Sequence, residues 1–166
     1  MTQTLQSRPA LHKDVPRITE IYNQGIEDRT STFETRPRSE TDVAAWFDGK
    51  HPIVVVEVEG QVQAFASTSS YRARECYAGI AEFSVYVARE ARGQRLGEVA
   101  MRALIEESEK AGFWKLLSRV FPENQASLKM LSRVGFCQVG VYQKHGQLEG
   151  VWKDVVIVER LLEKNL

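Results

Sequence analysis

Residues 80–111 constrain the fold more than any other segment of the chain. Residues 80–88, "IAEFSVYVA", are rich in β-branched and aromatic side chains, a composition typical of a strand. Residues 96–111 place apolar or small side chains at 96, 99, 100, 103, 104, 108 and 111 and charged ones mostly between them, which predicts a helix with one buried face. A short basic loop, "RGQRLG", joins the two elements. This order predicts a strand–loop–helix unit of an α/β fold.

The loop within "ARGQRLGEVAM", residues 91–101, is placed to bind an anion. The amides of a helix's first turn have no intrahelical partner, and the helix dipole favours negative charge there. Gly93 and Gly97 allow a phosphate to approach the backbone, and Arg92 and Arg95 can add charged hydrogen bonds. Taken alone, the same loop could equally be a solvated basic turn.

The rest of the chain predicts six more strands and three more helices. The strands are expected at 5–11, on either side of a Glu59-Gly60 turn within 53–69, and at 113–121, 137–144 and 152–162. Asp14 is expected to cap a helix over 15–24, and Ser39 with Asp42 resembles a capping box for a short helix through Phe47. Asn124 is expected to cap a helix that ends at Gly135. The fold class is therefore α/β (α+β), with a mixed, mostly antiparallel sheet of about seven strands and about four helices.

Composition excludes several classes of protein. Residues 1–166 show no linker, repeat or low-complexity segment, so a single domain is expected. The 22 basic and 22 acidic residues give zero formal net charge, which argues against nucleic acid as a partner. No apolar run is long enough to span a membrane, and the N-terminus lacks a signal-peptide core. Cys76 and Cys137 lie far apart without metal-ligand spacing, so we expect no metal site and a reducing cytoplasm.

Two motifs together resemble the GCN5-related N-acetyltransferase (GNAT) superfamily. They are the R-x-x-x-x-G loop after a strand and the segment "NQASLKMLSRVGF", an Asn-led helix that ends in Gly-Phe. The resemblance implies acetyl-CoA as cosubstrate, with its pyrophosphate on the loop and its pantetheine arm along the strand end and the Asn-led helix. Arg95 stands where the family pattern has its first glycine, but it keeps the backbone amide. The implied cofactor-binding residues are Val85, Tyr86, Val87, Arg92, Gly93, Gln94, Arg95, Leu96, Gly97, Glu98, Asn124 and Ser127.

The alternative for Asn124 is a helix cap without a ligand role.

Three further stretches resemble the phosphinothricin, arsinothricin and methionine sulfoximine N-acetyltransferase subfamily: "TSTFE", "RARECYAGIAEFSVYVA" and "GVWKDVVIVERLL". The resemblance implies acetylation of the α-amine of a small glutamate-like amino acid, a role in resistance or detoxification, and a homodimer. Close relatives of this subfamily acetylate ordinary L-amino acids such as methionine, so an ordinary amino acid is an alternative substrate.

Glu82 is the candidate general base. Strand alternation places Glu82, Ser84 and Tyr86 on one face of the sheet and Phe83, Val85 and Val87 on the other. A lone glutamate in an apolar strand is costly unless it is paired or used, and the subfamily's proposed base matches this position. The alternatives are a surface glutamate or a structural ion pair. By the superfamily's geometry, the amide of Val87 or its neighbour would donate to the thioester oxygen.

The sequence does not identify a single general acid. The position of a frequent family tyrosine acid is Leu131 here, so Tyr86, Tyr142, His145 or no residue would serve as general acid.

Arg72 and Arg74 match the subfamily's basic pair and would bind the carboxylate or phosphinate of the substrate, unless they form only a solvated loop. Phe33 would line the substrate pocket or anchor its loop. Trp152 and Asp154 would shape the pocket or pack and pair the last strand.

Two other functions fit the same sequence. One is an acetyltransferase of this fold that acts on another amine, such as a protein N-terminus or a polyamine, although Arg72 and Arg74 argue against a large cationic substrate. The other is an acetyl-CoA-binding module without catalytic activity. That alternative would be favoured if Glu82 could be replaced without effect.

Overall fold

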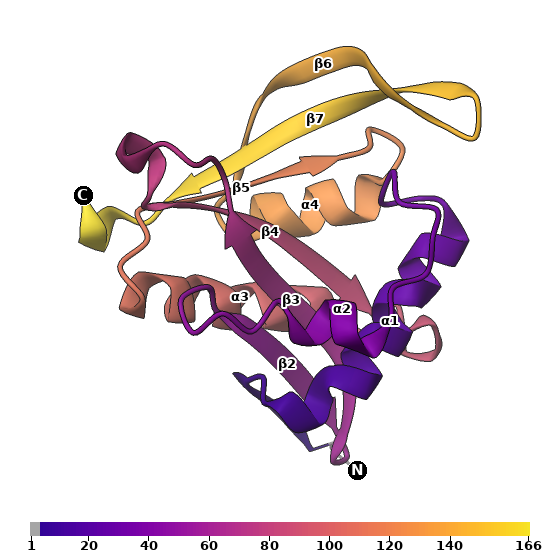
Figure 1. Cartoon of the computed structure of the whole chain (residues 1–166), viewed down its shortest axis with the longest axis vertical. Coiled ribbons are helices and arrows are strands. Elements are labelled where there is room, and N and C mark those ends of the chain that lie inside the picture. Colours follow the sequence, from indigo (N-terminus) through magenta and orange to yellow (C-terminus); the bar gives the residue numbers. More distant parts are fainter. Residues whose placement is uncertain (1–3) are drawn as a thin grey trace.

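The structure is a computed structural model that describes residues 4–166. In this range seven strands form one sheet in the order β1-β2-β3-β4-β5-β7-β6, accompanied by four α-helices (Figure 1). All neighbouring strands are antiparallel except β4 and β5, which are parallel. The predicted fold class is therefore confirmed.

The predicted elements are present, with some shifted ends. The strands are β1 (Leu5–Pro9), β2 (Ile53–Val58), β3 (Gln61–Ser70), β4 (Ile80–Val87), β5 (Lys115–Val120), β6 (Cys137–Leu148) and β7 (Val151–Leu161). The helices are α1 (Val15–Asp28), α2 (Glu40–Ala44), α3 (Leu96–Lys110) and α4 (Gln125–Arg133).

Two expectations about the first helices need correction. Helix α1 continues to Asp28, one turn beyond the predicted end, and Asp14 makes no capping bond to it. The Asp14 carboxylate instead accepts hydrogen bonds from Leu11 N and from both terminal nitrogens of Arg8, because a charged partner competes with the helix amides. Helix α2 ends at Ala44, short of Phe47, although the predicted Ser39–Asp42 capping box is present.

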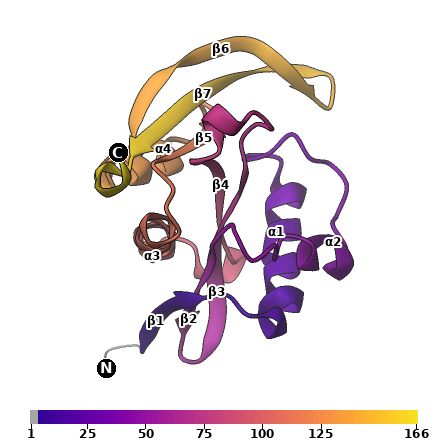
Figure 2. The same cartoon turned by 60° about the vertical axis from the view of Figure 1, so that its left-hand side comes forward.

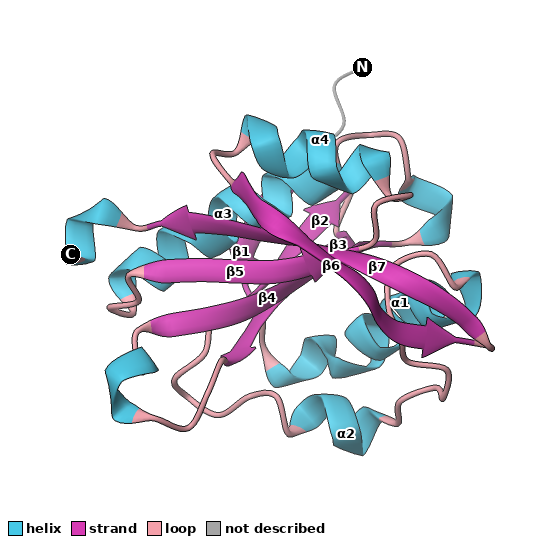
Figure 3. Cartoon of the chain, turned by 90° about the horizontal axis from the view of Figure 1, so that it is seen from above, coloured by secondary structure: helices cyan, strands magenta, loops and turns pink. Residues whose placement is uncertain are grey.

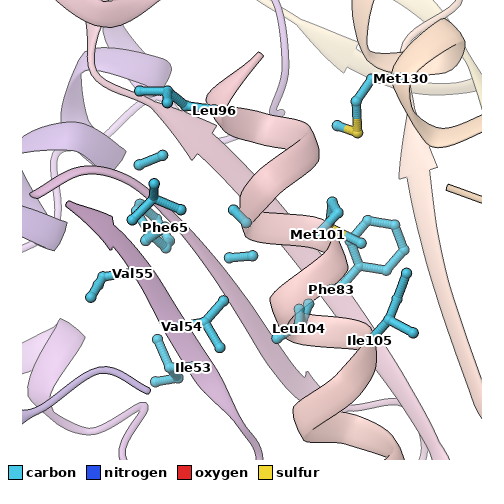
Figure 4. Close-up of a cluster of buried hydrophobic side chains, with 14 of the residues drawn as sticks. Ile53, Val54, Val55, Phe65, Phe83, Leu96, Met101, Leu104, Ile105 and Met130 are labelled. Atoms are coloured by element: carbon cyan, nitrogen blue, oxygen red, sulfur yellow. The ribbon is translucent and has the colours of Figure 1, made fainter. Parts of the chain in front are cut away.

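The helices cover the two faces of the sheet in pairs. Seen from above, α1 and α2 lie on one side of the strands and α3 and α4 on the other (Figure 3). Helix α3 places Leu96, Met101, Leu104 and Ile105 against the central strands, where all four are buried (Figure 4). Leu96 and Leu104 belong to the predicted apolar stripe, whereas Met101 and Ile105 were not part of it, so the buried face is shifted by about one residue from the prediction. This packing fixes the start of α3 at the end of β4.

Helix α4 ends in a Schellman motif. Phe136 N donates to Leu131 O and Gly135 N to Ser132 O, and Gly135 has a φ of +93°. Phe136 is buried with its ring centroid 4.9 Å from that of Phe83 of β4. The predicted end of this helix is thus confirmed, and it ties α4 to the strand that carries Glu82.

Strands β6 and β7 form a long hairpin that arches beyond the rest of the molecule (Figure 2). Five large apolar side chains on it are more than half exposed: Val139, Val141, Tyr142, Val151 and Trp152. Its tip is held to the end of α1 by an ion pair between Arg29 Nε and Glu149 Oε1 at 2.7 Å.

Candidate active site

The site forms where the two parallel strands separate. Strands β4 and β5 pair only over Ile80–Glu82 with Lys115–Leu117. At the fork, Ser118 Oγ donates a 2.8 Å hydrogen bond to the Phe83 carbonyl oxygen. Beyond this point the β5 side of β4 has no ladder partner, so backbone groups of its last residues are available to a ligand.

A cavity of about 60 Å³ occupies the fork. Its lining comes from both faces of the sheet: Ser31, Phe83, Ser84, Val85, Tyr86, Ser118, Arg119, Val120, Asn124, Ser127 and Leu131. Since side chains of adjacent strand residues point to opposite faces, this cavity connects the α1 side of the sheet with the α4 side.

A larger cleft of about 430 Å³ adjoins the fork cavity. The two share five lining residues: Ser31, Val85, Tyr86, Asn124 and Ser127. The cleft runs from the end of β4 past the start of α3 to α4. It brings together every cofactor-binding residue predicted from the sequence except Gln94: Val85, Tyr86, Val87, Arg92, Gly93, Arg95, Leu96, Gly97, Glu98, Asn124 and Ser127.

The loop before α3 turns sharply to present its amides. Gly93 has a φ of +85° and Arg95 a φ of +60° with ψ of 24°. The left-handed conformation at Arg95 explains why glycine is the natural residue there, since a side chain costs roughly 1–2 kcal/mol in it. Arg95 is exposed and makes no ion pair with any residue from 4 to 166.

Arg92 has a partner that the sequence did not reveal. Its Nη2 lies 2.5 Å from Asp28 Oδ2, and Arg89 Nη2 lies 2.9 Å from Asp28 Oδ1. Burial opposes ionisation of Asp28, but the two guanidinium groups hold its pKa below the usual value. The end of α1 and the loop before α3 are thereby joined by charge, and an anion bound at Arg92 would share that arginine with Asp28.

Asn124 is the cap predicted for α4. Its Oδ1 accepts a hydrogen bond from Ser127 N at 3.3 Å, and its side chain lines both the fork cavity and the cleft. The capping role is confirmed, while a contact to a pantetheine arm stays a prediction.

Glu82 lies on the same face of β4 as Tyr86, as strand alternation predicted, and this face is the one covered by α1, since Tyr86 packs against Tyr22. Its register partners are Ser69 of β3 and Leu117 of β5. Its Oε1 accepts a 3.1 Å hydrogen bond from Nη1 of Arg119, which stands two residues beyond Leu117 on the same face. The Glu82 side chain is 27% exposed. The structure thus contains the ion pair named above as an alternative to a lone base, and the carboxylate remains reachable by solvent.

The candidate general acids occupy different surroundings. Burial, followed by the neighbouring Tyr22, raises the pKa of Tyr86 above its usual range, which makes it a weaker proton donor. Leu131 is buried and lines the fork. Tyr142 and His145 lie beside each other in β6, with ring centroids 4.7 Å apart and ring planes tilted by 34°.

The predicted substrate residues are not gathered into the fork cavity. Arg72 and Arg74 lie exposed in the loop between β3 and β4, above the rings of Tyr71 and Tyr77 respectively. Phe33 packs edge-on against Phe121, with ring centroids 4.9 Å apart, and so anchors the loop after α1.

In the last strand, Asp154 Oδ1 accepts a hydrogen bond from Lys144 N, so it pairs the hairpin, while Trp152 is 56% exposed.

The site residues that were missed in the sequence include Asp28, Ser31 and Arg119. The available signal for Arg119 was a charged residue near the end of β5, the strand that leads from α3 to the Asn-capped helix α4. Nothing local marked Asp28 or Ser31, because their part in the site depends on where α1 ends.

Two expectations from the sequence concerned metal sites and membrane-spanning segments. Among residues 4–166, no cluster of histidine, cysteine, aspartate or glutamate is placed to hold a metal ion, and both cysteines are free and exposed. No helix in the described range is long and apolar enough to cross a membrane.

Comparisons with known proteins agree with this geometry. Residues 18–136 match the acetyltransferase (GNAT) family. The phosphinothricin N-acetyltransferase of Streptomyces coelicolor is 30% identical over 97% of this chain and 98% of its own. The L-methionine sulfoximine/L-methionine sulfone acetyltransferase of Pseudomonas aeruginosa is 32% identical over 90% of each chain. A phosphinothricin acetyltransferase from Sinorhizobium meliloti, solved in complex with acetyl-CoA, superposes with a TM-score of 0.86 at 30% identity and covers 97% of this chain and 89% of its own.

The family match spans most of the chain, and these relatives align along nearly all of it. The forked strands, the cleft at the start of α3 and the Asn-capped helix lie inside the matched region. The chain therefore belongs to the GNAT family, in the group of the phosphinothricin and methionine sulfoximine acetyltransferases, and is an N-acetyltransferase.

Proposed function

We propose that the protein transfers an acetyl group from acetyl-CoA to the α-amino group of a small glutamate-like amino acid, of the phosphinothricin, methionine sulfoximine or arsinothricin type. One observation carries the proposal: the cleft at the start of α3 shares lining residues with the fork cavity, and the wall of that cavity includes Arg119, the ion-pair partner of Glu82. This arrangement allows donor and acceptor to meet in one ternary complex without a covalent enzyme intermediate. The proposed role is resistance or detoxification.

The residues of the cleft fit acetyl-CoA. The first turn of α3 offers unpaired amides, and Arg92 and Arg95 stand beside it to receive a pyrophosphate. Gly97 leaves space, since a Cβ there would lie 3.5–3.9 Å from Met130, Val87 and Val85. The unpaired side of β4 can hold a pantetheine arm as a sheet edge holds a peptide. When bound, the cofactor supplies a reactive acetyl thioester.

The chain's own residues would then prepare the acceptor. Glu82 takes a proton from the acceptor's ammonium group, directly or through one water, since only the free amine has a lone pair to attack with. An α-amine has a reference pKa of about 8, so a modest base suffices. The amide of Val87 or its neighbour donates a hydrogen bond to the carbonyl oxygen as negative charge develops there. As the new C–N bond forms, the C–S bond breaks and coenzyme A would leave as its thiolate, so no residue is required as general acid.

The acceptor side is supported by the relatives' names and by the basic residues of the loop before β4. The two curated relatives described above act on phosphinothricin and on methionine sulfoximine or sulfone. Arg72 and Arg74, at the end of the sheet where β4 begins, would meet the oxyanion of such a substrate, and Phe33 would border its pocket. A second candidate, acylation of ordinary L-amino acids, is favoured by a relative named L-amino acid N-acyltransferase at 27% identity.

The exposed apolar hairpin supports a homodimer. Val139, Val141, Tyr142, Val151 and Trp152 are more than half exposed on two neighbouring strands, and β6 is an edge strand of the sheet. A second copy of the chain would cover these side chains. Sedimentation equilibrium of the protein and of Val141→Asp tests this: the variant should be monomeric.

A thiol-release assay tests the activity. Acetyl-CoA should raise the melting temperature, and turnover should appear with at least one member of a panel of phosphinothricin, methionine sulfoximine, methionine sulfone and methionine. Glu82→Gln should lower kcat by about 10²-fold or more while acetyl-CoA still raises the melting temperature. Glu123→Gln, a control at an exposed glutamate paired with Lys153, should keep full turnover. Near-normal turnover of Glu82→Gln would remove Glu82 as the base.

A further inference from the structure

We infer that Arg119 binds the α-carboxylate of the acceptor, so that the Glu82–Arg119 pair recognises the α-amino-acid head group as a unit. The inference rests on the proposed function and deepens it, since it restricts the acceptor to zwitterionic α-amino acids. Arg119 is the only charged residue that lines the fork cavity among residues 4–166.

The pair matches the charges of an amino acid. Arg119 Nη1 and Glu82 Oε1 lie 3.1 Å apart, one positive and one negative group side by side on the face where the acceptor would bind. An α-amino acid likewise carries its ammonium and its carboxylate on one carbon. With the ammonium at Glu82, the acceptor's carboxylate falls beside the guanidinium, where each charge meets its opposite.

Arg119 retains the capacity for a second partner. A guanidinium has five N–H donors in a planar fork, and Arg119 uses one of them, on Nη1, in its bond to Glu82. Its side chain is 41% exposed. The free edge of the Arg119 guanidinium can therefore donate two hydrogen bonds to a carboxylate, the geometry that arginine favours, without breaking the bond to Glu82.

The position of Arg119 also fits the route of transfer. Its neighbours in the cavity wall include Asn124 and Ser127, which line the cofactor cleft as well. Two residues further along the chain, just past the end of β5, Phe121 packs against Phe33. A head group at Arg119 thus lies between the cleft and the aromatic pair, whereas Arg72 and Arg74 line no part of the fork cavity.

The test compares two acceptors on three proteins. The acceptors are the panel's best amino acid and its α-carboxamide, which keeps the amine and side chain but lacks the carboxylate charge. The proteins are the unaltered chain, Arg119→Met, and the control Lys164→Met, which removes a cation paired with Glu109 at the far end of α3. A melting-temperature shift with acetyl-CoA verifies that each protein is folded and binds the donor.

Arg119→Met should lower kcat/KM for the amino acid about 10- to 100-fold, mainly through KM, and leave kcat/KM for the carboxamide within about twofold. Lys164→Met should change neither. Equal losses with both acceptors would mean that Arg119 acts only through Glu82 or the fold, and would overturn the inference.

The unaltered chain gives a second readout that does not depend on the variant. It should prefer the amino acid to its carboxamide by at least about tenfold, because the free edge of the Arg119 guanidinium is otherwise left without its anion. Equal use of both acceptors would overturn the inference while the proposed acetyl transfer stands. Turnover of neither acceptor would instead refute the proposed function and the inference with it.

Discussion

Gly25 of α1 should be irreplaceable although alanine is the better helix former. A Cβ at this position would lie 2.6 Å from both Cδ1 and Cε1 of Tyr86. The Tyr86 ring cannot move aside easily, since its centroid lies 5.1 Å from that of Tyr22 and 5.6 Å from that of Phe65, which is fully buried. Contact at about 3.5 Å or more would require a shift of roughly 1 Å.

Two opposing effects set the magnitude. Replacing glycine by alanine inside a helix stabilises it by about 1 kcal/mol. Overpacking a dense site costs about 1–3 kcal/mol, and here two ring atoms clash at once against a ring wedged between neighbours. The steric cost should win, so Gly25→Ala should lower the free energy of unfolding by about 1–2 kcal/mol and the melting temperature by about 2–8 °C.

Gly97→Ala is the matched control, because it makes the same chemical change at the start of α3. Its Cβ would meet Met130 and Val87 at 3.5 and 3.7 Å, which is ordinary van der Waals contact. Urea unfolding should therefore show unchanged or slightly raised stability for Gly97→Ala. Acetyl-CoA binding should weaken, since the new methyl group enters the cleft. A Gly25→Ala protein that is more stable than the unaltered chain would refute the packing argument.

Three shorter predictions concern charge and strain. Arg95→Gly should raise the free energy of unfolding by up to about 1 kcal/mol in urea, because it relieves a left-handed side-chain conformation; a loss of stability would show that the arginine is not strained. Arg74→Ala should raise the KM of the amino acid far more than that of acetyl-CoA, and equal changes would indicate a folding defect. Burial opposes ionisation of Asp48, but hydrogen bonds from the His51 backbone and ring, and then from a neighbouring amide, lower its pKa from 3.8 to about 2. Its contribution to stability is thus complete above about pH 4 and lost as the pH falls toward 2. Asp48→Asn should flatten that part of a stability–pH curve.

Much of the fold was predictable because local patterns agree with the tertiary packing. Residues close together in the sequence mark the buried face of α3. In the same way, the capping box at Ser39 marks the start of α2, and Gly135 marks the end of α4. The cofactor cleft was predictable for the same reason, since half of its lining comes from one continuous segment, the end of β4 to the start of α3. Two predictions about the first helix were wrong: α1 continues beyond its predicted end, and the Asp14 carboxylate accepts hydrogen bonds from Arg8 instead of capping the helix.

The acceptor side could not be predicted in the same way. The pair of Glu82 and Arg119 joins residues 37 positions apart, and their contact depends on the register between β4 and β5. The partner of Arg92 depends equally on where α1 ends in space, because Asp28 reaches the loop before α3 from a different element. Side-chain charge is visible in a sequence, but the distance between two charges is not.

The sequence by itself determined the order of strands and helices, the anion-binding turn and the candidate base, since each is encoded by residues within a few positions of one another. Only the tertiary structure decided how far β4 and β5 stay paired, and hence where the sheet opens. It also decided which charges meet there: Arg119 at Glu82 and Asp28 at Arg92. The reason is physical: periodicity and capping act along the chain, whereas an ion pair requires two separate elements to be packed within about 4 Å of each other.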